Sequence, residues 1–235
     1  MKTGSRDSAA RIKPAVLVIG SSNTDLIIKL ARLPQPGETI LGGEFGHAAG
    51  GKGANQAVAA ARAGGAVTFL ACVGRDANDA AALAGFAADG INVKHVTRHP
   101  TRPSGVALIL VDRKGENCIA VAAGANDQLS PAAVRQAKQA FRRTQIVLLQ
   151  LETPLPTIMA AAQLAAAAGA RLVLNPGIHW RPPFPATNAP RAPIVMMTFW
   201  TPRARSRSAA RAAVTASATT TPVSRSASPA LGVRR

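Results

Sequence analysis

Short apolar runs rich in β-branched residues alternate with alanine-rich stretches of helical length between residues 15 and 175, and no other feature of the sequence constrains the fold as strongly. Parallel strands need a crossover connection, usually a helix, so this alternation predicts a parallel sheet with helices packed against it. We expect strands at residues 16–19, 67–73, 106–111, 118–121, 146–150 and 172–175, and helices at 55–63, 79–88, 131–142 and 155–168. The predicted fold class is a layered α/β domain.

Two stretches break this alternation. Residues 25–41 and 104–121 have the periodicity of strands without a helix between them, which is typical of β-hairpins. We therefore expect two hairpins that stand off the main sheet and form a small β lid.

The composition changes abruptly after Pro176, where Arg, Pro, Ala, Ser and Thr dominate and both periodicities end. We expect three regions: a flexible N-terminus at residues 1–14, an incomplete α/β domain with lid hairpins at 15–176, and a tail at 177–235 that is disordered or translated from a shifted reading frame. The frame-shift hypothesis places the shift after Asn175. It rests on residues 197–200, whose codons, read from the third base, encode Asp, an apolar residue and Leu.

The chain carries 28 Lys and Arg against 11 Asp and Glu, a net charge of +17, and such an excess often indicates a nucleic-acid or membrane partner. Its distribution weakens that interpretation. Residues 1–176 hold 19 of the basic and all 11 of the acidic residues, a net charge of +8, and the other nine Arg lie in the tail. Arg203, Arg205, Arg207 and Arg211 could neutralise phosphates, but no aromatic residues are interleaved with them, which argues against nucleic-acid binding as the main function.

The apolar runs and the cysteines of the sequence indicate the cellular compartment of the protein. No apolar run approaches the roughly 18 residues of a membrane span, and the run at residues 15–19 is too short for a secretion signal. We therefore expect a cytoplasmic protein without a membrane partner. Cys72 and Cys118 lie in separate apolar runs without metal-ligand spacing, which indicates two buried side chains in a reducing compartment.

A glycine-rich turn at residues 50–55 (GGKGAN) leads into the first predicted helix. Glycines let a backbone approach a ligand closely, and a helix N-terminus offers free N–H groups to oxygen-rich ligands. The turn is not a phosphate-binding P-loop, because no Ser or Thr follows Lys52 and the glycine spacing differs. By spacing alone, a ligand-binding turn and a plain helix-capping turn are equally compatible with these residues.

Polar residues follow two of the predicted strands. Asn23 and Asp25 come after the first strand, and Glu152 follows the strand at 146–150. Ligands of open α/β sheets bind outside the carboxyl ends of the strands, where these side chains could hydrogen-bond the hydroxyls of a polyol. Taken singly, an Asx turn at residues 23–25 and a solvated Glu152 are the more common explanations.

Together these segments resemble the ribokinase family of sugar kinases over roughly residues 15 to 176. The family's N-terminal signature is a Gly-Gly pair followed by Gly-x-Asn and later glycines. It matches here at Gly50, Gly51, Gly53, Asn55, Gly64 and Gly74. Further matches follow in the same order at residues 36–39 (PGET), 124–126 (GAN) and 175–176 (NP).

The resemblance implies transfer of the γ-phosphoryl group of ATP to the 5-hydroxyl of D-ribose, with Mg²⁺ and a stimulating monovalent cation such as K⁺. It also implies a homodimer formed through the lid. The polar ribose contacts that it implies are Asn23, Asp25, Gly51, Lys52, Asn55 and Glu152, and the apolar lid contacts are Ala107 and Ile119.

The chain also departs from the family pattern. Family members take their catalytic base from the Asp of a C-terminal Gly-Ala-Gly-Asp motif, whose backbone amides form an anion hole, and an Asn-x-x-Glu motif helps to organise magnesium and phosphate. No Asp or Glu follows Glu152 in this chain, so we expect it to lack the catalytic base and the ATP and metal sites. His47, close to the glycine turn, is the other conceivable base, but a single His among small residues is more often a turn or surface residue.

The sequence thus leaves functions of different classes open. The favoured prediction is a sugar kinase of the ribokinase type, and we expect this chain itself to be catalytically inactive. A sugar-binding remnant or dimer partner without catalysis is the second, and nucleic-acid binding by the basic tail is the third.

Overall fold

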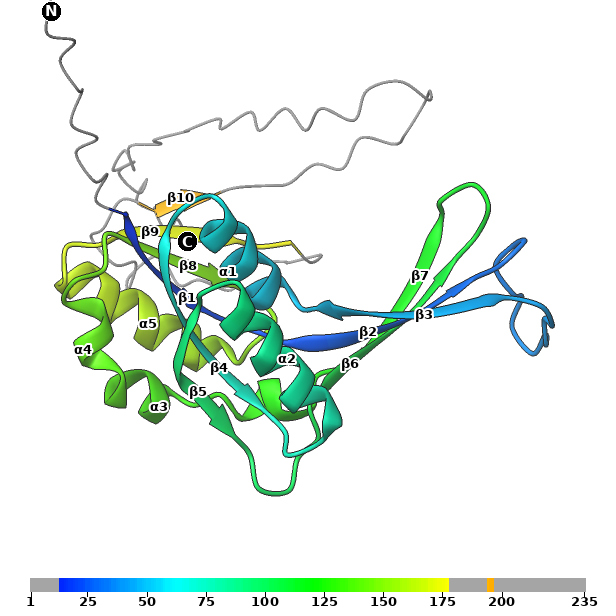
Figure 1. Cartoon of the computed structure of the whole chain (residues 1–235), viewed down its shortest axis with the longest axis horizontal. Coiled ribbons are helices and arrows are strands. Elements are labelled where there is room, and N and C mark those ends of the chain that lie inside the picture. The colour runs from blue at the N-terminus through cyan, green and yellow to red at the C-terminus, as the bar shows by residue number, and fades with distance from the viewer. Residues whose placement is uncertain (1–12, 178–193, 197–235) are drawn as a thin grey trace, which may run out of the picture.

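The computed structural model describes residues 13–177 and the backbone of residues 194–196 (Figure 1). Six strands form an all-parallel sheet in the order β10-β9-β8-β1-β4-β5. These strands are β1 (Ala15–Ile19), β4 (Ala66–Val73), β5 (Asn92–Arg98), β8 (Ile146–Gln150), β9 (Arg171–Asn175) and β10 (Ile194–Met196). The predicted layered α/β class is confirmed.

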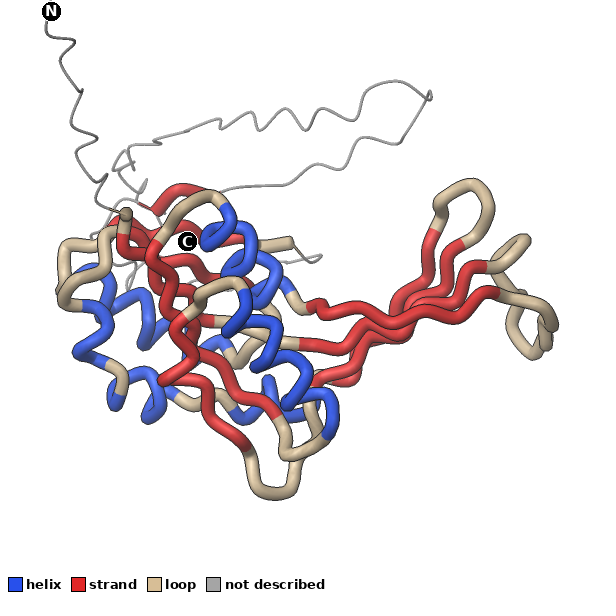
Figure 2. Tube along the Cα trace, viewed as in Figure 1, coloured by secondary structure: helices blue, strands red, loops and turns tan. Residues whose placement is uncertain are grey.

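Helices cover both faces of this sheet (Figure 2). On one face lie α1 (Lys52–Arg62) and α2 (Ala77–Ala88), and on the other lie α3 (Pro131–Gln136), α4 (Lys138–Phe141) and α5 (Leu155–Ala167). Successive residues of a strand point to opposite faces, so Val16 and Val18 of β1 join the core under α1 and α2, while Leu17 and Ile19 join the core under α3 to α5. None of the described helices is both long and apolar enough to cross a membrane.

Local caps fix where several helices begin. Asp76 caps α2 and forms a reciprocal capping box with Asp79, and Ser130 caps α3 ahead of Pro131. The prediction of one helix over residues 131–142 is wrong. The helix is interrupted at Ala137, where the backbone leaves helical geometry with φ = −83° and ψ = 12°, so that α3 ends and α4 begins there.

A second sheet of four strands projects from the α/β body, and we call it the lid sheet (Figures 1 and 2). Its order is β3-β2-β6-β7, with β2 and β6 parallel and the other pairs antiparallel. Its strands are β2 (Asn23–Lys29), β3 (Glu44–Gly50), β6 (Gly105–Val111) and β7 (Asn117–Ala122). A short 3₁₀ helix, η1 (Gly124–Gln128), follows β7 and returns the chain to the body.

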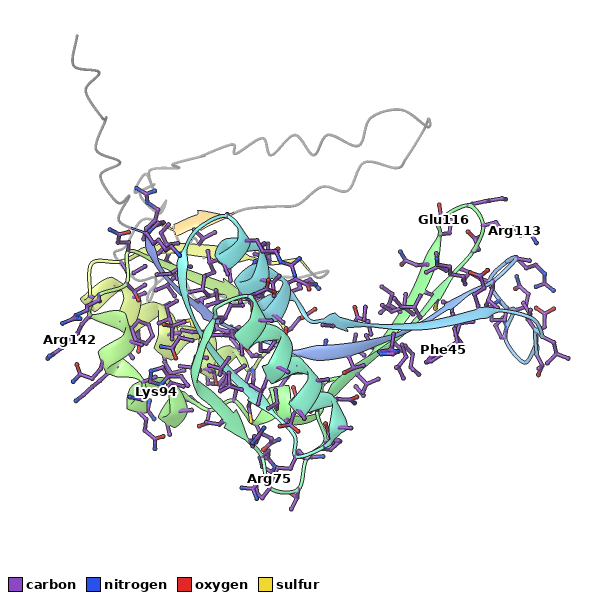
Figure 3. All side chains as sticks on the ribbon, in the orientation of Figure 1. Phe45, Arg75, Lys94, Arg113, Glu116 and Arg142 are labelled. Atoms are coloured by element: carbon purple, nitrogen blue, oxygen red, sulfur yellow. The ribbon has the colours of Figure 1, made fainter. Side chains whose placement is uncertain are left out.

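The predicted lid is present, but the first hairpin has other bounds than residues 25–41. Its return strand is β3, and residues 30–43 form the connection. Pro34 and Pro36 lie in that connection, and proline cannot donate a backbone hydrogen bond to a strand partner. Figure 3 shows Phe45 on the lid sheet, and Arg113 and Glu116 at its tip, far from the α/β body.

Three further differences from the sequence analysis concern exposed or edge segments. The polar edge strand β5 was not predicted, and β10 lies within the region 177–235 where no strand was expected. Cys72 is buried as predicted, whereas Cys118 is exposed, because every residue of β7 is exposed on the lid sheet. The predicted flexibility of residues 1–12 and disorder of residues 178–193 and 197–235 concern segments outside the described residues.

Phe69→Ala should lower the free energy of unfolding by about 3–5 kcal/mol, because Phe69 is fully buried and its ring meets Phe86 of α2 edge-on, with centroids 5.2 Å apart. Guanidinium unfolding followed by circular dichroism measures the change. Leu41→Ala, at a side chain that is 89% exposed, is the control and should change stability by less than about 0.5 kcal/mol. Similar losses in the two variants would contradict the assigned core.

Candidate functional site

Three connections meet where β1 and β8 end, at the base of the lid sheet (Figure 1). They are the link from β1 to β2 at residues 20–22, the turn from β3 into α1 at Gly51, and the loop after β8 that carries Glu152. A backbone hydrogen bond from Ala54 N to Ser21 O at 2.9 Å joins the first two. This is the carboxyl edge of the parallel sheet, where open α/β folds place their ligands.

The glycine turn is held close to the β1–β2 link. Gly51 has φ = 88°, a conformation that favours glycine, and a Cβ there would lie 2.9 Å from the backbone nitrogen of Asn23. A Cβ on Gly53 would lie 2.6 Å from the nitrogen of Ser21. Both glycines are therefore required for the first turn of α1 to pack against residues 21–23.

Glu152 holds the N-terminus of α1, which has no capping side chain of its own. Its Oε2 accepts hydrogen bonds from the backbone nitrogen of Lys52 at 2.9 Å and from Oγ of Ser21 at 2.6 Å, and its Oε1 accepts one from Nζ of Lys52 at 2.5 Å. Burial by itself raises the pKa of Glu152, but the hydrogen bonds from Lys52 and Ser21 outweigh this effect and leave the pKa below its ordinary value. The side chain is thus an ionised cap for α1.

Asp25 is the second carboxylate of the site and differs from Glu152. It lies near the start of β2 beside Gly50, where any Cβ would overlap the carboxylate. Burial, and next the negative charge of Glu152, raise the pKa of Asp25 above its ordinary value, while Lys52 opposes the shift. Asp25 accepts no hydrogen bond within residues 13–177, so both of its oxygens are available to a ligand.

Asn23, two residues before Asp25 on the same face of β2, is held by Asn126 of η1. Nδ2 of Asn126 donates to Oδ1 of Asn23 at 2.8 Å. Asn126 also bonds the backbone of Ser22 through both ends of its amide, and it is 1% exposed. The structure therefore adds Asn126 and Ser21 to the predicted residues.

Of the remaining predicted residues, some lie beside Asp25 and others lie away from it. Ala107 is buried on β6 in register with Asp25, so it lies next to the carboxylate across the strand pair. Ile119 lies further out on β7, in register with Ile109, and is 52% exposed. Asn55 is exposed on the first turn of α1, and its side chain makes no hydrogen bond within the described part of the chain. The structure gathers Asn23, Asp25, Gly51, Lys52, Glu152 and Ala107, but it does not bring Ile119 into this group.

Two other candidates lie outside the group. His47 is exposed on β3 and adjacent in sequence to Ala48, the partner of Asp25, so it points to the other face of the lid sheet. A hollow of about 420 Å³ lined by Arg75, Asp76, Asp79 and Arg98 lies after β4, but its carboxylates cap α2 and bind Arg98. We interpret this hollow as part of the helix-capping structure.

The described residues do not fit a magnesium site. Among them, no three His, Cys, Asp or Glu side chains gather closely enough to hold a metal ion. Mg²⁺ prefers carboxylate oxygens, and of the two carboxylates here Glu152 already accepts three hydrogen bonds from Lys52 and Ser21. The carboxylate and amide groups of this site instead suit a neutral ligand rich in hydroxyl groups.

Known proteins share this fold and this segment order. A family model described as pfkB family carbohydrate kinase matches residues 13–196, well over half of the chain. The chain belongs to the pfkB family of carbohydrate kinases. The resemblance to ribokinases drawn from the sequence is thereby confirmed.

Relatives in this family carry sugar-kinase names. Ribokinase of Haemophilus influenzae is 41% identical over 165 residues, which are 70% of this chain and 54% of that protein. Deoxyribokinase of Salmonella typhi is 38% identical over 161 residues, 68% of this chain and 53% of that protein. The structure of Arabidopsis thaliana ribokinase complexed with ribose and ATP matches with a TM-score of 0.63 and 31% identity, over 71% of this chain and 54% of that one. The chain spans about half the length of the curated relatives it matches.

Glu152→Gln should lower the free energy of unfolding at neutral pH by about 1.5–3 kcal/mol, the range for a hydrogen bond to a charged group. The folded-state pKa of Glu152 lies below the ordinary value of 4.5, so the wild type holds this stability above about pH 4.5 and loses it as the pH falls through the folded pKa. The gap between the two proteins should therefore shrink on acidification. Denaturant unfolding over a pH series measures it.

The control for this series is Glu116→Gln at the exposed tip of the lid sheet, which should leave stability at neutral pH unchanged. A gap between wild type and Glu152→Gln that stays constant down to about pH 3 would contradict the ionised cap.

Proposed function

We propose that residues 15–176 form the sugar-binding part of a ribokinase-type carbohydrate kinase and that its sugar is D-ribose. The observation that carries the proposal is the unpartnered carboxylate of Asp25, which faces the glycine turn beside Lys52 and Glu152 at the carboxyl edge of the sheet. A half-buried carboxylate without protein donors suits a ligand that supplies them. Membership of the pfkB family makes a sugar the expected ligand.

The chemistry of these residues matches a small polyol. The two oxygens of Asp25 can each accept a hydrogen bond from a sugar hydroxyl. Gly50 lets the Asp25 carboxylate lie close against the backbone of β3, and Ala107 offers an apolar surface next to Asp25. Glu152 acts here by fixing Lys52 and the helix start, and it reaches a sugar hydroxyl with a remaining lone pair.

The choice of D-ribose rests on the relatives and on the residue set. Relatives at 35–41% identity include proteins named ribokinase, and others at 38% are named deoxyribokinase. The two sugars differ in one hydroxyl. Asn23, Asp25 and Glu152 together provide several polar partners, which favours the sugar with more hydroxyls.

Phosphoryl transfer forms the second part of the proposal. In a kinase of this type ATP supplies the phosphoryl group, and Mg²⁺ and K⁺ are the cofactors expected with it. The described residues do not fit a metal site, and no Asp or Glu follows Glu152 in the 235 residues. We therefore propose that this chain binds the sugar but does not by itself phosphorylate it.

The lid sheet supports a further part of the proposal, association with a second copy. Phe45, 68% exposed, and Leu108, 55% exposed, lie on one face of the lid sheet, and Val121, also 55% exposed, lies on the opposite face. An apolar sheet left open in this way is commonly covered by a partner. A sugar-binding dimer partner without catalysis is the alternative function that this observation favours.

Asp25→Ala should weaken D-ribose binding by at least about 100-fold, because the sugar would lose a half-buried carboxylate that accepts no hydrogen bond within the described residues and is free to accept its hydroxyls. Isothermal titration calorimetry of the full chain with D-ribose measures this. The matched control is Asp89→Ala, which removes an ion pair with Arg62 on the far end of α1 and should leave ribose affinity unchanged. Ribose binding that survives Asp25→Ala would refute the site.

The 235-residue chain should produce no ADP above background with D-ribose, ATP and Mg²⁺. Loss of a positioned general base alone costs on the order of 10²–10⁴ in rate, and the anion hole would be lost with it. A coupled ADP assay on protein free of host kinases measures this. Robust ribose-dependent ADP production would contradict the proposal that this chain lacks the transfer machinery.

A further inference from the structure

We propose that Asn126 is a positioning residue that fixes which end of the Asn23 side-chain amide faces the sugar site. The inference rests on the proposed function only in naming the ligand, because the amide orientation follows from protein contacts alone. Asn126 lies in η1, 103 residues after Asn23, and both side chains are buried.

The backbone determines the orientation of Asn126. The backbone nitrogen of Ser22 can only donate, and it lies 2.9 Å from the Asn126 amide, so the atom facing it must be Oδ1. Nδ2 of Asn126 then faces the carbonyl oxygens of Ala123 at 2.9 Å and Ser22 at 3.2 Å, both of which can only accept. Reversing this amide would break all three contacts.

The orientation of Asn126 in turn determines that of Asn23. Nδ2 of Asn126 is a donor with no acceptor capacity, so the atom of Asn23 that lies 2.8 Å away must be Oδ1. A Cβ on Gly105 would overlap both of these atoms, so the glycine at the start of β6 makes their contact possible. Nδ2 of Asn23 is left as the free end of its amide.

That free end adds a donor to a site whose carboxylate can only accept. Nδ2 of Asn23 makes no hydrogen bond within residues 13–177, and it is not among the buried polar atoms shut off from solvent. Asn23 and Asp25 share one face of β2, so a donor and an acceptor lie side by side. Two neighbouring hydroxyls of a sugar fit this pair, one accepting from Asn23 and the other donating to Asp25.

Side-chain amide hydrogen exchange, measured by NMR on the full chain without any sugar, tests the orientation directly. In the wild type the NH₂ protons of Asn126 should exchange slowly and those of Asn23 fast. In Asn126→Asp the carboxylate can only accept, so the Asn23 amide should turn and its NH₂ protons should become protected. Slow exchange of the Asn23 protons in the wild type would overturn the proposal without any variant.

Ribose affinity gives the second readout, through a double-mutant cycle. Asn126→Asp should weaken D-ribose binding about tenfold when Asn23 is present. In an Asn23→Ala background the same change should weaken binding less than about twofold, because the Nδ2 donor of Asn23 is already gone. A merely structural role of Asn126 would weaken binding equally in both backgrounds, and that result would overturn the proposal. Asn92→Asp, the same change at an exposed position of β5, is the control and should alter neither readout.

The two readouts separate failure of this inference from failure of the proposed function. If the wild type binds no D-ribose but shows the expected exchange pattern, the sugar assignment is wrong and the positioning of Asn23 stands. If it binds D-ribose and the Asn23 protons are protected, the proposed function stands and Asn126 does not position Asn23 as inferred.

Discussion

The carboxylate of Glu152 is the group on which the geometry of the candidate site depends. It links the loop after β8 to the start of α1 and to the β1–β2 connection, through three hydrogen bonds from Lys52 and Ser21. Half-buried charges are costly unless they are paired, and here the Lys52 ammonium and the positive end of α1 both offset the negative charge. Because α1 has no local cap, the position of the glycine turn depends on a residue 100 positions away.

The site and the lid sheet share a strand. β2 begins at Asn23 in the floor of the site and continues outward to Lys29 in the lid sheet, so residues at the site and residues of the outer lid sheet belong to one strand. The parallel pairing of β2 with β6 brings Ala107 beside Asp25. A ligand that binds at Asp25 and a partner that covers the outer lid sheet therefore act on the same strand.

Much of the fold could be predicted from the sequence, because the buried strands β1, β4 and β8 have continuous apolar runs between turn residues. Edge strands were missed for the opposite reason: β5 alternates polar and apolar residues weakly, and β10 is only three residues long. The exposure of Cys118 was missed because an apolar run does not show whether a sheet has anything packed against it.

The candidate site was predictable in part. The glycine turn, Asp25 and Glu152 stand out by residue type and by their place after predicted strands. Sequence spacing could not show that Glu152 caps α1 or that Asn126 holds Asn23, because these contacts join residues 100 and 103 positions apart. The match at residues 124–126 marked Asn126, but only the fold brings it to Ser22 and Asn23.

We propose above all that D-ribose binds at the carboxyl edge of the parallel sheet, between the glycine turn and the base of the lid sheet. A titration of the isotope-labelled full chain with D-ribose, followed by backbone amide NMR, tests it most directly. We expect the largest chemical-shift changes on residues 20–25, 50–55 and 105–107 and on Glu152. Absence of shifts, or shifts centred instead on the hollow at Arg75 and Arg98, would contradict it.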